Sequence, residues 1–280
     1  MNARRLRRFL VGAGAACALA AAAWIWLPAD VPDFDAVRAQ FTPSDGFLLD
    51  RNGAVVERER LDFGVRRGEW VALDEISPAL REAIVAGEDQ RFWQHGGVDW
   101  RGVGGALRDR ALRRNARGAS TITMQVAAQL EHLARPRDSF AAWSRKLREV
   151  RVAYGLERRW SKAQILEAYL NLLDYRGELQ GIGAAAGVLA HKAPSGLSGA
   201  ESAVLAALLP APDESRESLV ARACARERSR AAPVDCDAIQ DAAERLLARR
   251  TTPSQSSSAE VGHRLGWISM LSSIGTVAAL

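Results

Sequence analysis

Glu88 is the first residue whose position suggests chemistry. It follows Leu80 and Ile84 by eight and four residues, so the three side chains share one face of a helix. Because the two neighbours are apolar, we expect the carboxylate to point inward. A carboxylate in apolar surroundings gains and loses a proton closer to neutral pH, which suits a general acid or base. The alternatives are a surface residue or one neutralised by Arg91.

Glu149 is the second candidate. Arg145 and Lys146 precede it by four and three residues, so all three crowd one side of a helix. This combination fits a phosphate-bearing substrate: the cations bind phosphate, and the carboxylate could hold a divalent ion or steer a leaving group. The alternative is an ordinary ion-paired surface.

Residues 118–125 contain the third feature, in which small residues precede hydroxyl side chains at a predicted helix start. Such a start can bind an anion or a sugar hydroxyl. The alternative is a simple helix cap.

The surrounding pattern predicts a mostly helical domain behind a short β segment. Residues 46–73 predict short strands, with a hairpin turn at Asp50-Arg51-Asn52-Gly53 and a further strand over 65–71. Ser77 and Pro78 predict a helix start with a capping hydroxyl. Further helices are expected from residue 118, over 143–159, over 161–173 behind a Ser161/Gln164 capping box, and over 198–209 behind a Ser198/Glu201 box. Residues 213–250 are charged and predicted to be helical.

The N-terminus predicts export. The chain has 280 residues and a net charge of +5, and Arg4, Arg5, Arg7 and Arg8 supply four of the positive charges. The uncharged residues 9–27 would span about 28 Å as a helix, close to the hydrocarbon thickness of a bilayer. Arginines before this run place that end in the cytoplasm. A cleaved signal peptide is the alternative, and both interpretations export the rest of the chain.

The remaining composition excludes some classes. The sequence has no basic stripe interleaved with aromatic residues, so nucleic acid is not an expected partner. Cys17 lies in the apolar run, and no Cys/His cluster has zinc-site spacing. Cys224 and Cys236 could form a disulfide in an oxidising compartment, or remain two thiols.

Five motifs, in order, resemble those of the peptidoglycan glycosyltransferases of family 51. The first is Glu-Asp-Gln-Arg-Phe-Trp-Gln-His-Gly-Gly-Val-Asp at 88–99, and the second is Gly-Ala-Ser-Thr-Ile-Thr-Met-Gln at 118–125. The others lie at 145–149, 161–171 and 192–212. The chain is most similar to the N-terminal part of a 1C-type class A penicillin-binding protein.

This resemblance implies a lysozyme-like fold with a small β lead-in and an N-terminal transmembrane helix. It implies domains at 1–28 (anchor), 29–75 (linker and strands), 76–212 (glycosyltransferase) and 213–280 (charged extension and tail). The implied activity joins lipid-linked disaccharide-peptide units, known as lipid II, into glycan strands with inversion, releasing undecaprenyl pyrophosphate. The implied location is the periplasmic side of the bacterial inner membrane, in a single-pass protein with other cell-wall synthases as further partners.

The resemblance also implies roles for individual residues. Glu88 would be the base for the acceptor 4-hydroxyl, and Glu149 would assist pyrophosphate departure, with Mg²⁺ or Mn²⁺ as an optional cofactor. Lys162, Glu167 and Asn171 look structural. The implied substrate-binding residues are Asp89, Phe92, His95, Ser120, Thr121, Gln125, Arg145 and Lys146.

The sequence departs from the family at several positions. Ala128 occupies a position where family members commonly have a basic residue, a role that Arg135 or Arg137 could take over. Met124 replaces a frequent glutamine, and His191 replaces the usual glycine. The Ser-x-x-Lys and Lys-Thr-Gly motifs of the transpeptidase half do not occur, so crosslinking and reaction with penicillin are not expected. A lysozyme-like muramidase and a non-catalytic, membrane-tethered scaffold remain the rival functions.

Overall fold

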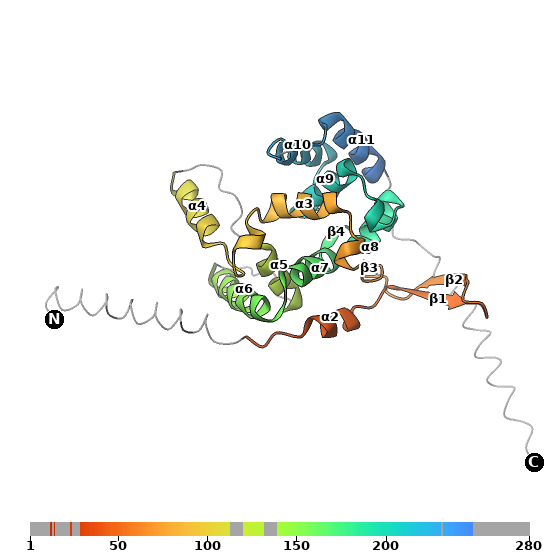
Figure 1. The fold of residues 1–280 in the computed structure, drawn as a ribbon, viewed down its shortest axis with the longest axis horizontal. Coiled ribbons are helices and arrows are strands. Elements are labelled where there is room, and N and C mark those ends of the chain that lie inside the picture. The colour runs from red at the N-terminus through yellow and green to blue at the C-terminus, as the bar shows by residue number, and fades with distance from the viewer. Residues whose placement is uncertain are drawn as a thin grey trace, which may run out of the picture. The chain divides into compact units, whose positions relative to one another are not determined.

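The computed structural model describes residues 29–112, 120–131, 139–230 and 232–248, and residues 12, 14 and 23 (Figure 1). The predicted membrane run at 9–27, apart from those three residues, and the tail from residue 251 lie outside this description. Within the described ranges, no helix has the length and apolar character needed to cross a membrane.

A short helix and a hairpin come first. Helix α2 covers Phe34–Gln40, and strands β1 (Asp45–Leu49) and β2 (Val55–Arg60) pair antiparallel. Asp50 Oδ1 accepts the backbone N–H groups of Asn52 and Ala54, each at 2.8 Å, and Gly53 takes a positive φ of 82°. The side chain and the glycine together close the turn, so the predicted hairpin is confirmed.

A second, three-stranded sheet contains the start of the segment in which a strand was expected. Its strands β3 (Arg66–Arg67), β4 (Asp174–Arg176) and β5 (Leu179–Gln180) are ordered β3-β5-β4, with β3 parallel to β5. The expected strand at 65–71 is wrong beyond Arg67. The backbone of Val71 instead pairs with the Asn171 amide, whose side-chain oxygen accepts the Val71 N–H at 2.9 Å and whose nitrogen donates to the Val71 carbonyl.

The helices begin close to the predicted positions. Ser77 precedes α3 (Pro78–Glu88) as expected, but its hydroxyl donates to the Leu197 carbonyl at 3.0 Å, so the predicted capping bond is wrong. Both capping boxes are confirmed, ahead of α7 and α9. The other helices are α4 (Trp100–Ala111), α5 (Ile122–Leu130), α6 (Ser139–Arg159), α7 (Lys162–Leu172), α8 (Ile182–Ala185), α9 (Gly199–Leu208), α10 (Arg216–Glu227) and α11 (Cys236–Leu247), with short 3-10 turns at Leu73–Glu75, Phe92–Gln94 and Pro194–Gly196 and a π turn at Ala186–Ala190.

Helix α9 lies at the centre of the packing. Every residue of its last two turns is buried, and it contacts α3 on one side and α10 and α11 on the other (Figure 1). Helix α5 packs against α6 and α7. Residues 216–247 therefore share one core with the helices before them. The described fold is mainly helical with a few short strands, as predicted.

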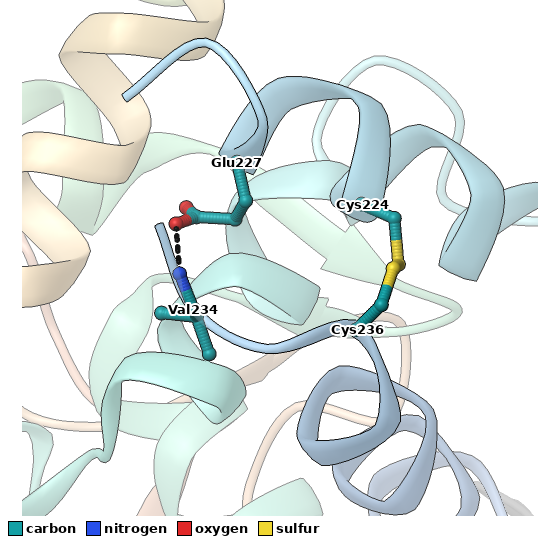
Figure 2. Close-up of a disulfide and its surroundings, with 4 residues drawn as sticks. All are labelled: Cys224, Glu227, Val234 and Cys236. Carbon is teal, nitrogen blue, oxygen red and sulfur yellow. Dashed lines mark hydrogen bonds between the residues drawn. A yellow bond between two sulfur atoms is a disulfide. The ribbon is translucent and has the colours of Figure 1, made fainter. Parts of the chain in front are cut away.

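Cys224 of α10 and Cys236 of α11 form a disulfide, with 5.5 Å between their Cα atoms (Figure 2). Of the two alternatives that the sequence allowed, the bonded one is confirmed.

Candidate active site

A groove of about 690 Å³ opens beside the C-terminal end of α3. Its walls come from α3 and the loop that follows, from α4, from the start of α5, and from α10. Of the predicted site residues, those that line it are Glu88, Asp89, Ser120, Thr121 and Gln125.

Glu88 is the last residue of α3, and its side chain is 11% exposed. Leu80 and Ile84 are fully buried, as the helical spacing predicted. Arg91 does not neutralise Glu88, because it pairs with Asp99 at 2.6 Å. The partner of Glu88 is Arg226 of α10, whose Nη2 lies 2.9 Å from Glu88 Oε1.

Asp89 is buried and supports the loop behind the groove. Both of its carboxylate oxygens lie 2.9 Å from His95 Nε2, and Oδ2 accepts the Ile122 N–H at 3.1 Å. That N–H is one of the unpaired donors in the first turn of α5, where a carboxylate is favourable. The backbone N–H of Gly97 donates to His95 Nδ1 at 3.2 Å. Asp89 thus ties motif one to the start of α5.

Phe92 and His95 do not line the groove. Phe92 is fully buried, and Lys162 Nζ lies 4.3 Å from its ring centroid. Lys162 also pairs with Glu157 at 2.7 Å. In the described geometry, Phe92 and His95 therefore support the loop from within.

The start of α5 presents polar groups to the groove. Thr121 is its N-cap: its hydroxyl accepts the Met124 N–H at 3.1 Å and donates to the Gly97 carbonyl at 2.6 Å. Gln125 Nε2 lies 3.4 Å from Glu88 Oε2, and its carbonyl accepts the Tyr169 hydroxyl at 3.3 Å. Burial raises the pKa of Tyr169 well above its ordinary value, so this hydroxyl stays a donor.

Glu149, Arg145 and Lys146 form one cluster on α6. Arg145 donates to Glu149 Oε1, and Lys146 Nζ lies 2.9 Å from Oε2. The Glu149 side chain is only 4% exposed, against about a third for each cation, so an ordinary surface ion pair does not describe it. Lys146 Nζ also donates to Ser120 at 2.6 Å, which joins the cluster to the groove wall.

The described residues do not favour a metal at Glu149. Both carboxylate oxygens already accept bonds from cations, and a divalent ion would have to displace them. Within the described ranges, no group of three or more His, Cys, Asp or Glu side chains is placed to hold a metal ion. Arg135 and Arg137, the predicted substitutes for a basic residue at Ala128, lie outside the described residues.

Two arginines of α10 are groove residues that the motifs did not indicate. Arg226 Nη1 donates to the Ala206 carbonyl at 3.1 Å and Arg222 Nη1 to the Ala207 carbonyl at 2.9 Å, both in the last turn of α9. Burial, together with the positive charge of Arg226, lowers the pKa of Arg222. The only signal in the sequence was their spacing of four, which places both on one face of a helix.

The residues expected to be structural do hold the frame. Glu167 accepts the Trp70 indole N–H at 2.7 Å and the Leu73 N–H at 2.9 Å. Asn171 is fully buried and bonded to Val71, as described above. These bonds fasten the segment before α3 to α7. They therefore fix the start of α3, the helix that carries Glu88 at its other end.

Comparisons with known proteins agree with the five motifs. The family model described as transglycosylase matches residues 54–233, more than half of the chain. The "biosynthetic peptidoglycan transglycosylase" of Mannheimia succiniciproducens is 36% identical over 172 residues, 61% of this chain and 67% of the relative. The protein of that name from Pectobacterium atrosepticum is 40% identical over 172 residues, with the same two shares. A third, from Pasteurella multocida, is 40% identical over 144 residues, 51% of this chain and 56% of the relative.

Proposed function

The chain belongs to the transglycosylase family, and we propose that its groove joins lipid-linked disaccharide-peptide units into peptidoglycan glycan strands. Family membership and the named relatives support peptidoglycan glycosyltransferase activity. Lipid II and the growing strand are then the two substrates. The mainly helical architecture is consistent with the lysozyme-like fold that we infer for the domain.

One observation in particular supports this function. The short segment from Ser120 to Gln125, at the start of α5, connects a largely buried acid to a cation cluster: Gln125 lies near Glu88, and Ser120 binds Lys146. Glycosyl transfer from a pyrophosphate needs a base at the attacking hydroxyl and positive charge at the leaving group. Glu88 lines the groove, and the cation cluster adjoins its wall through Ser120.

We assign the proton transfer to Glu88. The acceptor 4-hydroxyl attacks C1 of the growing strand and gives its proton to the Glu88 carboxylate. The new bond forms from that oxygen to C1, while the bond from C1 to the pyrophosphate oxygen breaks on the opposite face with its electron pair. Attack and departure on opposite faces account for inversion.

Arg145 and Lys146 face the charge that develops on departure. Pyrophosphate gains negative charge as the bond to C1 breaks, and prearranged cations stabilise it without reorganisation. Glu149 is bonded to both cations and buried, so its role in this proposal is to hold them in place. No step requires a metal.

The substrate's lipid also supports a location. We propose that residues 9–27 anchor the chain in the inner membrane, with the described domain on the periplasmic side, since lipid II is confined to a membrane.

No observation favours the muramidase alternative. Hydrolysis by paired carboxylates would need a second carboxyl group free to act as an acid or a nucleophile, whereas Glu149 is engaged by two cations.

The test is polymerisation of labelled lipid II by the purified, detergent-solubilised chain. Wild type should make glycan that a muramidase digests. Glu88→Gln should lower the rate by roughly 10²- to 10⁴-fold, the usual contribution of a general base, while the variant still folds. Glu59→Gln removes an exposed acid from β2 and should keep full activity. Equal polymer from wild type and Glu88→Gln would refute the assignment of the base.

A further inference from the structure

We propose that Arg226 is a positioning residue for the base: its guanidinium holds the Glu88 carboxylate in the orientation in which one oxygen accepts the acceptor's proton. This inference rests on the proposed function. It concerns a helix, α10, that lies beyond the last of the five motifs, which ends at residue 212.

The placement of Glu88 creates a need for a nearby cation. Glu88 is the last residue of α3, where the helix dipole presents partial negative charge. Only 11% of its side chain is exposed to water, so protein groups must supply most of its hydrogen bonds. Arg226 places positive charge 2.9 Å from Oε1 and donates a hydrogen bond that fixes the orientation of the carboxylate.

The geometry leaves one oxygen available to the substrate. Arg226 donates to Oε1 at 2.9 Å, whereas Gln125 Nε2 approaches Oε2 only to 3.4 Å. A carboxylate has about four lone-pair sites, so Oε2 can still accept a proton from a sugar hydroxyl.

Arg226 is held from both sides. Its Nη1 donates to the Ala206 carbonyl, so the planar guanidinium bridges the end of α9 and the base. The disulfide at Cys224 lies two residues away, and Glu227 accepts the Val234 N–H at 3.0 Å (Figure 2). Arg230 reaches back to Glu82 of α3 at 2.8 Å. Helix α10 is thus fixed to both α11 and α3, as a prearranged support requires.

The rival explanation is a purely structural cap, because Arg226 also satisfies an α9 carbonyl. A substitution at Gly87 allows the positioning role of Arg226 to be distinguished from its role as a structural cap. A Cβ on Gly87 would lie 2.6 Å from Arg226 Nη1 and 3.1 Å from Cζ, so alanine there must push the guanidinium aside. Alanine is also the better helix former. Gly87→Ala therefore disturbs Arg226 without weakening α3.

The kinetic experiment compares full-length variants in the lipid II assay. Arg226→Ala should lower kcat roughly 10- to 100-fold with KM nearly unchanged, because a misplaced base slows chemistry rather than binding. Arg226→Lys should recover part of kcat. Gly87→Ala should lower kcat at an undiminished Tm, and this effect should vanish in the Arg226→Ala background. Arg228→Ala, an exposed arginine just after α10, should match wild type.

A second measurement does not depend on activity. Glu88→Gln and Arg226→Ala should each lower Tm, and the double variant should lower it by less than their sum, since the partners interact. Arg222→Ala removes an α9 cap together with the ion pair between Arg222 and Glu214, so its Tm loss is an upper bound on the cost of losing such a cap. A wild type without polymerase activity would refute the proposed function. The Tm values of the two single variants and the double variant would still test the interaction between Glu88 and Arg226. Additive Tm losses, an Arg226→Ala enzyme with wild-type kcat, or a loss confined to KM would overturn the inference.

Discussion

Glu88 and Asp89 are adjacent acids with different surroundings. Asp89 is 6% exposed and bonded to His95 and to the first turn of α5, so its oxygens are engaged in holding the loop. Glu88 faces the groove and meets Arg226. Neighbouring residues at the end of a helix point in different directions. Asp89 can therefore support the loop while Glu88 faces the groove.

Glu201 gives a prediction at the same scale. Lys192 Nζ lies 2.9 Å from both of its oxygens, and Oε2 accepts the Ser198 N–H at 2.8 Å. Burial raises the pKa of Glu201, but the Lys192 and Ser198 bonds outweigh it, and the pKa falls below its ordinary value of 4.5. A lowered folded-state pKa gives stability that is present above the unfolded value and is lost as pH falls through the folded one.

We therefore expect Glu201→Gln to lower the free energy of unfolding by about 2 kcal/mol at pH 7, the scale of hydrogen bonds to a charged group. The difference from wild type should shrink as pH falls below about 4.5, where the wild-type carboxylate also takes a proton. Urea unfolding of both proteins at pH 7, 5 and 3.5 measures this. A constant difference across the three pH values would contradict it.

Single residues were predictable where local pattern decides their environment. The spacing of Leu80, Ile84 and Glu88 predicted an inward-facing acid, and the structure places it so. The partner of that acid was not predictable, because Arg226 follows it by 138 residues and meets it only through the packing of α10. Motif pattern alone likewise could not show that Phe92 is buried and away from the groove.

At the scale of elements, α10 and α11 depend on their covalent link. Each has 12 residues and many charged side chains, and each buries only one apolar stripe against α9. Short amphipathic helices gain most of their stability from such packing. Because Cys224 and Cys236 lie 12 residues apart, the disulfide restricts the unfolded chain between these two helices.

The paired variant Cys224→Ser/Cys236→Ser should lose about 3 kcal/mol of unfolding free energy, the chain-entropy value for a loop of this length. Wild type treated with a thiol reductant should show the same loss, and the variant should not respond to reductant. Urea unfolding, with alkylation and intact mass to count free thiols, gives both results. A variant as stable as oxidised wild type would contradict the prediction.

Elements followed the sequence at the hairpin turn and at both capping boxes, whereas the predicted cap at Ser77 was wrong because its hydroxyl bonds to the distant Leu197 carbonyl. The Asp50–Gly53 turn and both capping boxes formed as predicted, since their bonds join residues at most four apart. The expected strand to residue 71 failed because side chains of α7, about 100 residues later, bond to the backbone of this segment instead.

The particular similarity of this chain to a 1C-type class A penicillin-binding protein stays a prediction.

At the scale of the whole described chain, residues 29–34 are docked on the domain. Arg159 donates to the Val31 carbonyl, and the Trp160 indole donates to the Pro32 carbonyl at 3.0 Å. Phe34 meets the Trp160 ring edge-on at 5.3 Å. Val31 is 1% exposed, so this segment is part of the core. With an anchor proposed at residues 9–27, such docking would fix the groove at a set distance from the bilayer.

Gly155 of α6 allows this docking to be tested. A Cβ there would lie 2.5 Å from Val31 Cγ2 and 3.1 Å from Ala29 Cβ, so Gly155→Ala should displace the segment while favouring the helix. Gly104→Ala makes the same change in α4, where a Cβ meets nothing within 4 Å. We expect trypsin to cut after Arg38 several times faster in Gly155→Ala only. Polymerisation should fall more with lipid II in bilayers than in detergent, because only the bilayer constrains how the groove reaches its substrate. Equal cleavage in the two variants, or equal losses in the two media, would show that this segment does not position the domain.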